Sequence, residues 1–483
     1  MRFLKLLRKI FSSDKIPLKL LIGWIVLLSI LYSLLSVIRH NSFQSGAFDL
    51  GLYDQAAWQY ANFLYPFNTI KERFILGDHL TLTLPLLSVL YFAWSNVRML
   101  LIFQAVFLAL SSIPIYKLIR IRKFSPFAAL NLSIVYSLFF GIQFAVFFDF
   151  HPVVIGVALL AWTAYFYESE KYKLFFTMLS LLILTQENMG IALAGLGFIY
   201  FFKREYRRDS IMFIALGLII SLIQVKAVGL FSPAGYEYFP KINFDPINLI
   251  QKYFDSTDKR MVWLYSFSWY SFLPLLSPGA VFAVTLDLSQ YFLPAKAYNH
   301  MITPFFHHRA ILSPLLLVAT LDVLDFLKKK GLKPGYVTIF MLLFAFSLQF
   351  IYHFPLNKLS KPAYWKNEDW MNDTREILKL VPSEASVAAQ QNLVPHLSHR
   401  KEIYLVWPRK IDLVSNVCGQ KTCWWLEFAG KPQYLVVDVH PGSWVTQLLE
   451  TPENFKSALN NMQKAGKIKI YKNIGYAYIY KIN

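Results

Sequence analysis

The sequence has little charge and only two cysteines among its 483 residues. Charged residues make up 16% of the chain, whereas soluble domains use roughly 25%, and 56% of the residues are hydrophobic. No phosphate-binding loop, zinc-finger cysteine set, His-Glu-x-x-His motif or nucleophile elbow occurs in the sequence. These absences argue against a soluble protein and against cytosolic nucleotide chemistry.

The hydrophobic residues are concentrated in runs of about 20, the length that crosses a hydrocarbon layer about 30 Å thick. We therefore expect an α-helical polytopic membrane protein with about eleven transmembrane helices. The basic segment Met1–Lys19 and the apolar run after it predict a retained signal anchor with a cytoplasmic amino terminus. The expected spans are Leu20–Ile38, Val97–Ile119, Phe127–Phe147, Pro152–Tyr167, Leu174–Thr185, Met189–Phe202, Ile211–Val228, Met261–Leu276, Ala280–Leu293, Ile311–Leu327 and Tyr336–Phe354.

A formal net charge of +19 would suggest nucleic acid as a partner of a soluble protein, but here Lys and Arg form short clusters between apolar runs. Such clusters follow the positive-inside rule of membrane proteins, so we expect no nucleic-acid partner. We interpret Leu80–Trp94 as a juxtamembrane helix, which places Lys117–Lys123, Lys203–Arg208 and Lys328–Lys333 on the cytoplasmic side. We therefore expect a multi-pass protein of the plasma membrane, in contact with the lipid bilayer.

The pattern changes after residue 354, where charges and prolines become frequent and short β-rich runs alternate with amphipathic stretches. We expect residues 1–354 to form a transmembrane domain, with a first external loop at 39–96 and the juxtamembrane helix at 80–94. Residues 355–483 are expected to form a soluble α/β domain outside the cytoplasm.

Both cysteines, Cys418 and Cys423, lie in this C-terminal domain. An extracytoplasmic site would permit a disulfide between them, and two free thiols are equally consistent with the sequence. A single pair supplies too few ligands for a zinc site.

Polar residues collect in the loops that we place outside the cytoplasm. The first loop carries Asp49, Asp54 and Asp78, followed by His79. Low dielectric and apolar neighbours favour the protonated carboxyl group, so these carboxylates are candidates for a general base. Asp49 could instead cap a helix over Leu50–Tyr60, since aspartate accepts hydrogen bonds from the first-turn amides.

A second polar group lies where spans meet the outer face and contains Asp149, His151 and Glu187. Ionisable residues at this depth are unfavourable, so they tend to face a cavity that serves a site. Pairing with a neighbouring helix would also satisfy them.

A third polar group occupies the loop before the span Ile311–Leu327 and consists of Lys296, His300, His307, His308 and Arg309. These side chains could bind the phosphate of a lipid carrier, or Lys296 and Arg309 could extend to lipid headgroups. Since His307 and His308 are adjacent, they do not share a helix face, which disfavours a metal site made by this pair. The sequence requires no cofactor and leaves a divalent metal open.

Several motifs follow one another along the chain, namely Phe48-Asp-Leu-Gly-Leu-Tyr-Asp-Gln55 with Trp58, Gly77-Asp-His79, Asp149-Phe-His-Pro152, Glu187 and Val394-Pro-His-Leu-Ser-His-Arg400. This ordered set resembles a family of uncharacterised prokaryotic membrane proteins that is classed with the GT-C glycosyltransferases. The similarity covers nearly the whole chain. The chain departs from that family at Gln186, where a basic residue usually precedes the acidic one.

The resemblance implies an enzyme that transfers a sugar from a polyprenyl-phosphate-linked donor to an extracytoplasmic glycan, lipid or protein acceptor. It implies that Asp49 is the general base or metal-binding acid, with Asp54 and Asp78 as alternates. On this hypothesis Asp49 deprotonates or orients an acceptor hydroxyl, while Arg309, His300 or Lys296 neutralises the departing phosphate.

Two other classes of protein stay open on the sequence. A transporter or lipid flippase would also use polar residues among many spans, but such residues usually lie at mid-membrane, and no internal repeat is visible. A non-catalytic envelope protein that binds a partner through its external domain is the second alternative.

Overall fold

The computed structural model describes residues 14–232, 235–237, 246–294, 299–412, 417–442 and 451–483. The chain divides into two units, each built from several segments. The helical unit contains the chain up to Ser36, Leu76–Thr83 and Ile102–Lys361. The mixed unit contains Val37–Ile75, Leu84–Leu101 and Pro362–Asn483, so it combines most of the first loop with the C-terminal region.

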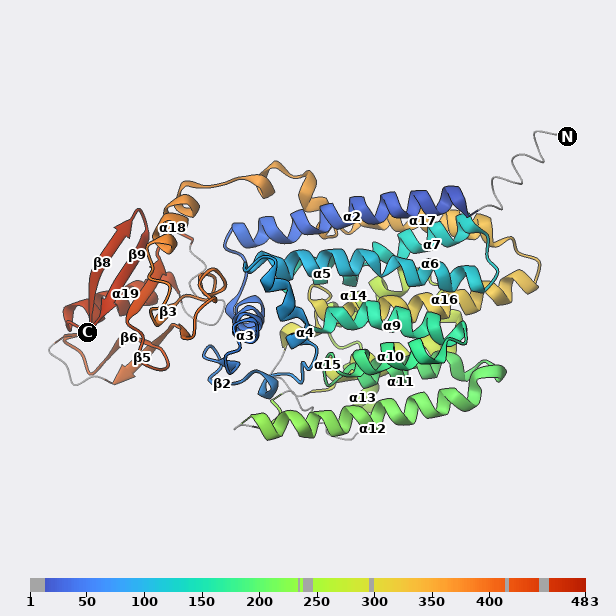
Figure 1. Ribbon diagram of the computed structural model, residues 1–483, viewed down its shortest axis with the longest axis horizontal. Helices are drawn as coiled ribbons and strands as arrows, with labels where there is room; N and C mark the ends of the chain where they lie inside the picture. Colours follow the sequence, from blue (N-terminus) through green and yellow to red (C-terminus); the bar gives the residue numbers. More distant parts are fainter. Residues whose placement is uncertain (1–13, 233–234, 238–245, 295–298, 413–416, 443–450) are drawn as a thin grey trace. The chain divides into compact units, whose positions relative to one another are not determined.

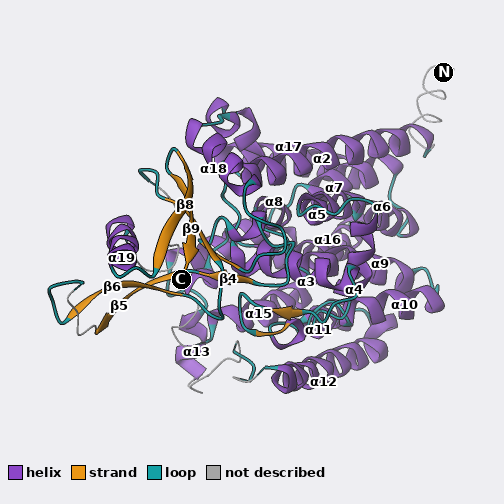
Figure 2. Cartoon of the chain, turned by 60° about the vertical axis from the view of Figure 1, so that its left-hand side comes forward, coloured by secondary structure: helices purple, strands orange, loops and turns teal. Residues whose placement is uncertain are grey.

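Long apolar helices make up the helical unit, and α2 and α12 lie at opposite edges of it (Figures 1 and 2). Each of the eleven expected spans falls on one helix or on two consecutive helical segments. The helices of this unit are α2 (Lys15–Asn41, which ends in the mixed unit), α5 (Arg98–Leu110, which begins there), α6 (Ser112–Ile121), α7 (Pro126–Ser137), α8 (Phe140–Phe147), α9 (Val153–Glu168), α10 (Tyr172–Ile183), α11 (Met189–Phe201), η4 (Arg204–Tyr206), α12 (Arg207–Phe231), α13 (Pro246–Lys252), α14 (Thr257–Ser268), η5 (Leu273–Leu276), α15 (Pro278–Phe292), η6 (Asn299–Ile302), η7 (His307–Arg309), α16 (Leu312–Lys329), α17 (Pro334–Ile351) and η8 (Pro355–Ser360).

Five helices among the described residues are long and apolar enough to cross a membrane, or six if α7 and α8 form one span bent by 45°. The five are Lys15–Asn41, Arg98–Ile121, Arg204–Phe231, His307–Lys329 and Pro334–Ile351. In contrast, α10 has 12 residues and α11 has 13. A helix of that length measures about 20 Å, less than the hydrocarbon layer of about 30 Å. The count of eleven spans therefore stays a prediction.

Two local features of the sequence set the helix boundaries and the helix spacing. Ser125 and Ser277 each precede a proline and accept a hydrogen bond from the backbone amide three residues on, so they cap α7 and α15. On α11, a Cβ at Gly190 would lie 2.3 Å from the carbonyl oxygen of Gly217 on α12. Only glycine at both positions allows these two helices to approach so closely.

All the strands among the described residues belong to the mixed unit, and its largest sheet has five strands (strands are orange in Figure 2). The strand order is β4-β3-β7-β9-β8, in which β3 runs parallel to β4 and β7, and β9 runs antiparallel to β7 and β8. The apolar run of β7 is buried at four of its five positions, as expected for a strand covered on both faces. The elements are η1 (Ala47–Gly51), α3 (Leu52–Ala61), β1 (Phe67–Asn68), β2 (Arg73–Phe74), η2 (Ile75–Gly77, which ends in the helical unit), α4 (Leu84–Ser88), η3 (Val89–Phe92), η9 (Pro362–Trp365), α18 (Asp369–Lys379), β3 (Val387–Ala389), η10 (Val394–His396), β4 (Ile403–Leu405), β5 (Trp407–Asp412), β6 (Thr422–Glu427), β7 (Tyr434–Asp438), α19 (Pro452–Lys464), β8 (Ile468–Ile474) and β9 (Ala477–Ile482).

The first loop belongs to the mixed unit because its polar side chains bond to the sheet edge. Thr69 Oγ1 donates to the carbonyl oxygen of Ile403 at 2.6 Å and accepts from the amide of the same residue at 2.9 Å. Gln55 Nε2 donates to Thr69 Oγ1 at 2.9 Å. Thr69 thus continues the hydrogen bonding of β4 into the first loop.

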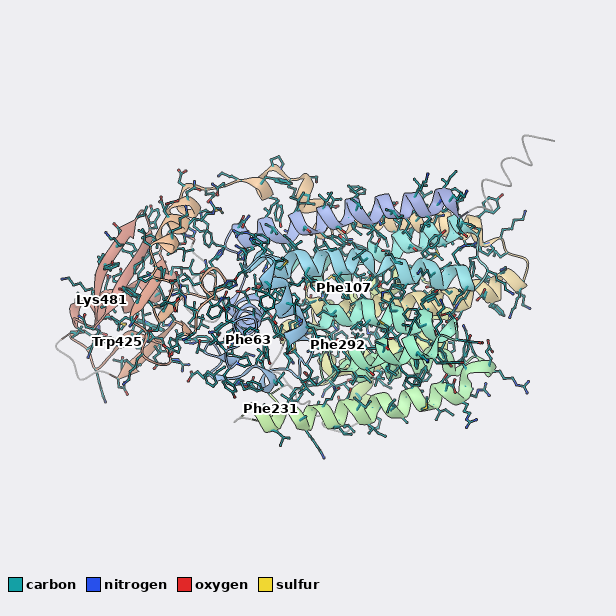
Figure 3. The ribbon with its side chains drawn as sticks, in the orientation of Figure 1. Phe63, Phe107, Phe231, Phe292, Trp425 and Lys481 are labelled. Atoms are coloured by element: carbon teal, nitrogen blue, oxygen red, sulfur yellow. A yellow bond between two sulfur atoms is a disulfide. The ribbon has the colours of Figure 1, made fainter. Side chains whose placement is uncertain are left out.

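The expected juxtamembrane helix at 80–94 is shorter in the structure and consists of α4 followed by the turn η3. Its side chains include Leu86, Val89 and Phe92, each more than half exposed. Phe63, labelled in Figure 3, is 90% exposed and stacks on Phe92 with ring centroids 6.5 Å apart. An apolar exposed face of this kind suits the membrane surface.

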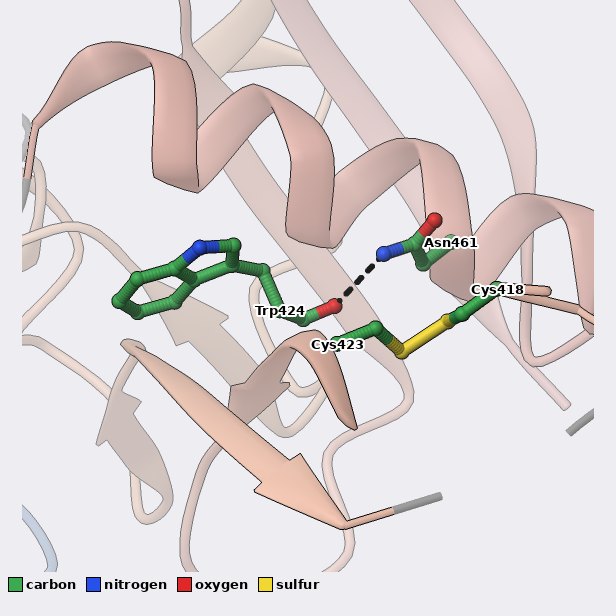
Figure 4. The surroundings of a disulfide bond; sticks show 4 residues. All are labelled: Cys418, Cys423, Trp424 and Asn461. Atoms are coloured by element: carbon green, nitrogen blue, oxygen red, sulfur yellow. Dashed lines mark hydrogen bonds between the residues drawn. A yellow bond between two sulfur atoms is a disulfide. The ribbon is translucent and has the colours of Figure 1, made fainter. Parts of the chain in front are cut away.

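A disulfide bond joins Cys418 to Cys423, which decides between the alternatives left open by the sequence (Figure 4). The bond closes a short loop at the start of β6. On the same strand the carbonyl oxygen of Trp424 accepts a hydrogen bond of 2.9 Å from Asn461 Nδ2 on α19 (Figure 4). The loop and the helix are therefore both fixed to β6.

Candidate functional site

The helical unit brings together six of the residues selected from the sequence. They come from four separate segments of the chain. Hydrogen bonds or ring contacts connect the four histidines and the glutamate, and the arginine contacts the ring of Tyr291, which His308 also contacts. We call them the histidine cluster: His79, His151, Glu187, His307, His308 and Arg309.

Glu187 is 1% exposed and lies in the short loop between α10 and α11. Its Oε1 is 2.6 Å from Nδ1 of His79, and its Oε2 accepts from the amide of Leu80 at 3.0 Å. The hydroxyl of Tyr236 donates to Oε1 at 3.0 Å. A carboxylate bonded to an imidazole in this way can orient the ring and take part in proton transfer.

Three imidazole rings form a stack, and a fourth meets its end edge-on. The rings of His151 and His307 lie 3.9 Å apart and are inclined by 16°, and those of His307 and His308 lie 4.1 Å apart. His79 meets His151 edge-on at 5.6 Å. The stack connects the Glu187 carboxylate to the segment that carries Arg309.

Arg309 is fully buried, and its guanidinium is only partly satisfied. One nitrogen, Nη2, donates to the carbonyl oxygen of Met301, while Nε and Nη1 have no hydrogen-bond partner among the described residues. The group lies over the rings of Tyr291 at 4.7 Å and Phe292 at 5.4 Å, and Phe292 is labelled in Figure 3. A buried cation with free donors is unfavourable unless an anion or water completes its bonds.

Backbone contacts hold these side chains in position. Gln104 on α5 accepts from the amide of His151 at 3.1 Å and donates to the carbonyl oxygen of Ala145 at 2.9 Å. Gly141 on α8 packs against the backbone of η7, since a Cβ there would lie 2.5 Å from the carbonyl oxygen of Arg309. The turn η7 is thereby fixed beside α8.

The other residues predicted for this unit are not all part of the cluster. Asp78 and Asp149 are buried and adjoin His79 and the Phe150-His151 segment in sequence. The backbone of His300 lies in η6. Lys296 lies outside the described residues.

Sequence reasoning missed Asp287 near this cluster, whereas Asn188 belongs to the polar run Gln186-Glu187-Asn188 that the sequence shows. Asp287 on α15 is 3% exposed, and its Oδ2 has no hydrogen-bond partner among the described residues. Asn188 donates to the hydroxyl of Tyr291 at 3.3 Å, which is the ring under Arg309. Asp287 is the single acidic residue in the apolar sequence of α15. An ionisable residue inside an apolar run is the feature by which the sequence could have indicated it.

The mixed unit contains a separate polar group around Asp54, which is completely buried on α3. Ser398 Oγ donates to its Oδ2 at 2.5 Å, Tyr91 donates to its Oδ1, and His399 Nε2 lies 3.0 Å from Oδ2. Burial lowers the pKa of His399. The charge of Asp54 and the hydrogen bond to it raise the pKa by more than burial lowers it, so the pKa of His399 lies above its ordinary value. Burial and Asp54 both raise the pKa of Tyr91.

Asp49 lies in the mixed unit on η1, which is a π-helical turn, and it is half-buried. The helix expected to begin at Leu50 starts three residues earlier, so Asp49 is inside the first turn and is not its N-cap residue. The N-cap position belongs to Gly46, which has no side chain to bond the first amides. Capping is therefore the wrong interpretation of Asp49, although an acidic side chain in a first turn still suits the helix dipole.

Among the residues that the structure describes, no three His, Cys, Asp or Glu side chains are arranged to hold a metal ion. The stacked imidazoles of the histidine cluster face each other's rings, which is not the geometry of a shared ligand set.

Comparison with known proteins places most of the chain in one family. Residues 39–444 match the model of the family described as Predicted membrane protein (DUF2079). The match covers the histidine cluster, Asp49 and Asp54, and it confirms the expectation of a membrane protein. No curated protein sequence matches the chain.

Proposed function

The chain belongs to the DUF2079 family of predicted membrane proteins, and from that premise we propose that it is a membrane glycosyltransferase. The donor is a sugar linked to a polyprenyl phosphate, and the acceptor is a glycan, lipid or protein outside the cytoplasm. The proposal includes the eleven-span topology and the extracytoplasmic position of the mixed unit. The disulfide between Cys418 and Cys423 supports that position, because disulfides persist in oxidising compartments.

The observation that carries this proposal is the state of Arg309. Its buried guanidinium keeps Nε and Nη1 without hydrogen-bond partners among the described residues. The carboxylate of Asp287 is close enough to act on its charge but accepts no hydrogen bond from it. A phosphate accepts two parallel hydrogen bonds from a guanidinium and neutralises its charge. The guanidinium binds the phosphate most tightly when the phosphate gains negative charge on leaving. This interaction is stronger in the transition state than in the ground state, and such a difference accelerates the reaction.

The proton in this proposal passes to the pair formed by His79 and Glu187. The oxygen of the acceptor hydroxyl forms a bond to the anomeric carbon of the sugar, and the bond from that carbon to the phosphate oxygen breaks. The bonding electrons leave with the phosphate, which Arg309 stabilises, and the hydroxyl proton goes to the imidazole–carboxylate pair. Asp49, in the mixed unit, is the alternative base that the family resemblance indicates.

Transfer of a radiolabelled sugar from polyprenyl-phosphate donors, measured in reconstituted vesicles, tests the role of Arg309. We expect Arg309→Gln to lower transfer about 100-fold or more, since one lost electrostatic contact in the transition state has this effect. Arg260→Gln is the matched control, because Arg260 is an exposed arginine of the same unit, on α14. Equal transfer by Arg309→Gln and wild type would refute the phosphate role.

Two carboxylate variants decide which residue accepts the proton. Glu187→Gln keeps an oxygen that can accept from Leu80, so it removes the charge with little change in shape. We expect it to lower kcat by about 10² to 10⁴ with little change in KM. If Asp49→Asn has this effect and Glu187→Gln does not, Asp49 is the base. If neither variant changes transfer, neither carboxylate is the base. If the wild-type protein consumes no donor, the glycosyltransferase proposal is wrong.

A further inference from the structure

Two arginines of the mixed unit, Arg98 and Arg375, are held beside one asparagine. Asn41 Oδ1 accepts from Arg98 Nη2 at 2.7 Å and from its Nε at 2.9 Å. The backbone carbonyl oxygen of the same Asn41 accepts from Arg375 Nη2 at 2.9 Å. Arg98 and Arg375 are far apart in the chain, and both bond to the same residue, Asn41.

The remaining bonds of both guanidiniums also go to neutral amide oxygens. Arg98 Nη1 donates to Asn96 Oδ1 at 3.2 Å, and Arg375 Nη1 donates to the Oδ1 atoms of Asn367 and Asn372, each at 2.8 Å. With three of five N–H groups used, each guanidinium keeps two donors for another ligand.

Neither arginine forms an ion pair with a carboxylate in the part of the chain that the structure describes. Other basic residues of this region do have acidic partners. On the same helix as Arg375, Lys379 Nζ lies 2.6 Å from Glu376 Oε1. Two like charges held together by neutral groups repel each other, and an anion between them would remove that repulsion.

The position of the pair in the chain indicates where its ligand comes from. Asn41 is the last residue of the candidate span Lys15–Asn41, and Arg98 is the first residue of the candidate span Arg98–Ile121. The ends of membrane spans lie at the level of the lipid headgroups, whose phosphates are recognised by arginine. Both arginines are half-buried, so part of each side chain stays accessible to a headgroup.

We propose that Arg98 and Arg375, positioned by Asn41, bind one phosphate group at the membrane surface. The phosphate belongs to a lipid headgroup or is free phosphate from solution, and the amides around the arginines fix the geometry for two bidentate contacts. This site lies in the mixed unit, uses none of the residues of the histidine cluster and does not depend on the proposed glycosyl transfer.

Ligand titration of the full chain in a non-ionic detergent tests this site. The probes are dioleoyl phosphatidic acid, dioleoylglycerol, which has the same chains and no phosphate, and inorganic phosphate. We expect phosphatidic acid to bind at least about tenfold more tightly than dioleoylglycerol, as measured by native mass spectrometry. Competition by millimolar inorganic phosphate with no preference for phosphatidic acid would identify free phosphate as the source.

The variants Arg98→Gln and Arg375→Gln should each weaken phosphate binding about tenfold or more, whereas Lys379→Gln, the paired cation on the same helix, should leave it unchanged. Arg98→Lys keeps the charge and loses the planar fork, so it should bind with intermediate affinity. Equal melting temperatures of these variants show that they are folded. The proposal is wrong if wild type binds neither phosphate probe above dioleoylglycerol, or if both Gln variants, folded, bind as wild type does.

Discussion

Asp54 and His399 form an ion pair of 3.0 Å between positions 345 residues apart in the chain. The pair links helix α3 of the first loop to the Val394–Arg400 motif, and both ends lie in the mixed unit. Since the pKa of His399 is raised by Asp54 beyond the lowering that burial causes, the ion pair favours the folded state when the imidazole is protonated.

The stability that this pair provides should fall as pH rises. A histidine with a folded pKa above the unfolded value of 6.5 contributes fully below pH 6.5 and loses its contribution as pH passes the folded pKa. We expect wild type to lose more thermal stability above pH 6.5 than His399→Gln does. The exposed His353 supplies a control, and His353→Gln should follow wild type. Parallel curves for wild type and His399→Gln would contradict the prediction.

Replacement of Arg122 should strongly destabilise the helical unit. Its side chain, 6% exposed, pairs with Glu168 and, at 2.5 Å, with Asp322, and Asp322 also pairs with Lys203 at 2.5 Å. Removing one partner of a buried ion pair leaves an uncompensated charge, so Arg122→Gln should lower the free energy of unfolding by about 3–5 kcal/mol. Denaturant titration measures this change.

A neighbouring arginine provides the control for Arg122. Arg120 pairs with Asp14 at 2.7 Å, but both side chains are considerably exposed. Exposed pairs contribute about 0–1 kcal/mol, so Arg120→Gln should have little effect. Similar losses in the two variants would show that burial does not set the strength of these pairs.

Gly141→Ala should displace the turn that carries Arg309. The added methyl would lie 2.5 Å from two backbone atoms of Arg309, and neither backbone atom can rotate away. We expect a loss of about 1–3 kcal/mol in the free energy of unfolding. Gly23→Ala on α2 meets nothing within 4 Å and should instead stabilise by about 0.5–1 kcal/mol. Thermal unfolding measures the stability of both variants. Equal stability of Gly141→Ala and Gly23→Ala would disprove the prediction.

The disulfide should be present in the purified protein without added oxidant. Neither Cys418 nor Cys423 should react with a maleimide in denaturing detergent until a reductant is added, and mass spectrometry counts the labels. Loop entropy for a bond between cysteines five residues apart predicts a stabilisation of about 2 kcal/mol. Labelling of both thiols before reduction would contradict the bond.

The sequence identified where the helices lie because their apolar runs are long and clearly bounded. It did not show the breaks inside two of these runs. The segment Phe127–Phe147 bends by 45° between α7 and α8, and α14 ends at Ser268, before the expected end at Leu276. Ser271 and Phe272 adopt positive φ at this break. Since neither residue is a glycine, the sequence does not predict the break.

Individual residues of the histidine cluster could also be selected from the sequence, because ionisable side chains are rare in apolar surroundings. Their convergence could not, since His79 and Glu187 are 108 residues apart and meet through helix packing. The arginine pair was missed for a related reason. In the sequence, Arg98 and Arg375 cannot be distinguished from other basic residues. The structure is needed to show that their hydrogen bonds go to neutral amide oxygens.

Strand β9 lies in the interior of the five-stranded sheet, between β7 and β8, although it comes last in chain order among the five. Strand β7 therefore has no partner on one side until residues 477–482 have been made. Completion of this sheet must follow the synthesis of the five candidate membrane spans found among the described residues. During that interval the exposed edge of β7 is open to wrong pairing, so its folding depends on how quickly translation delivers the final strand.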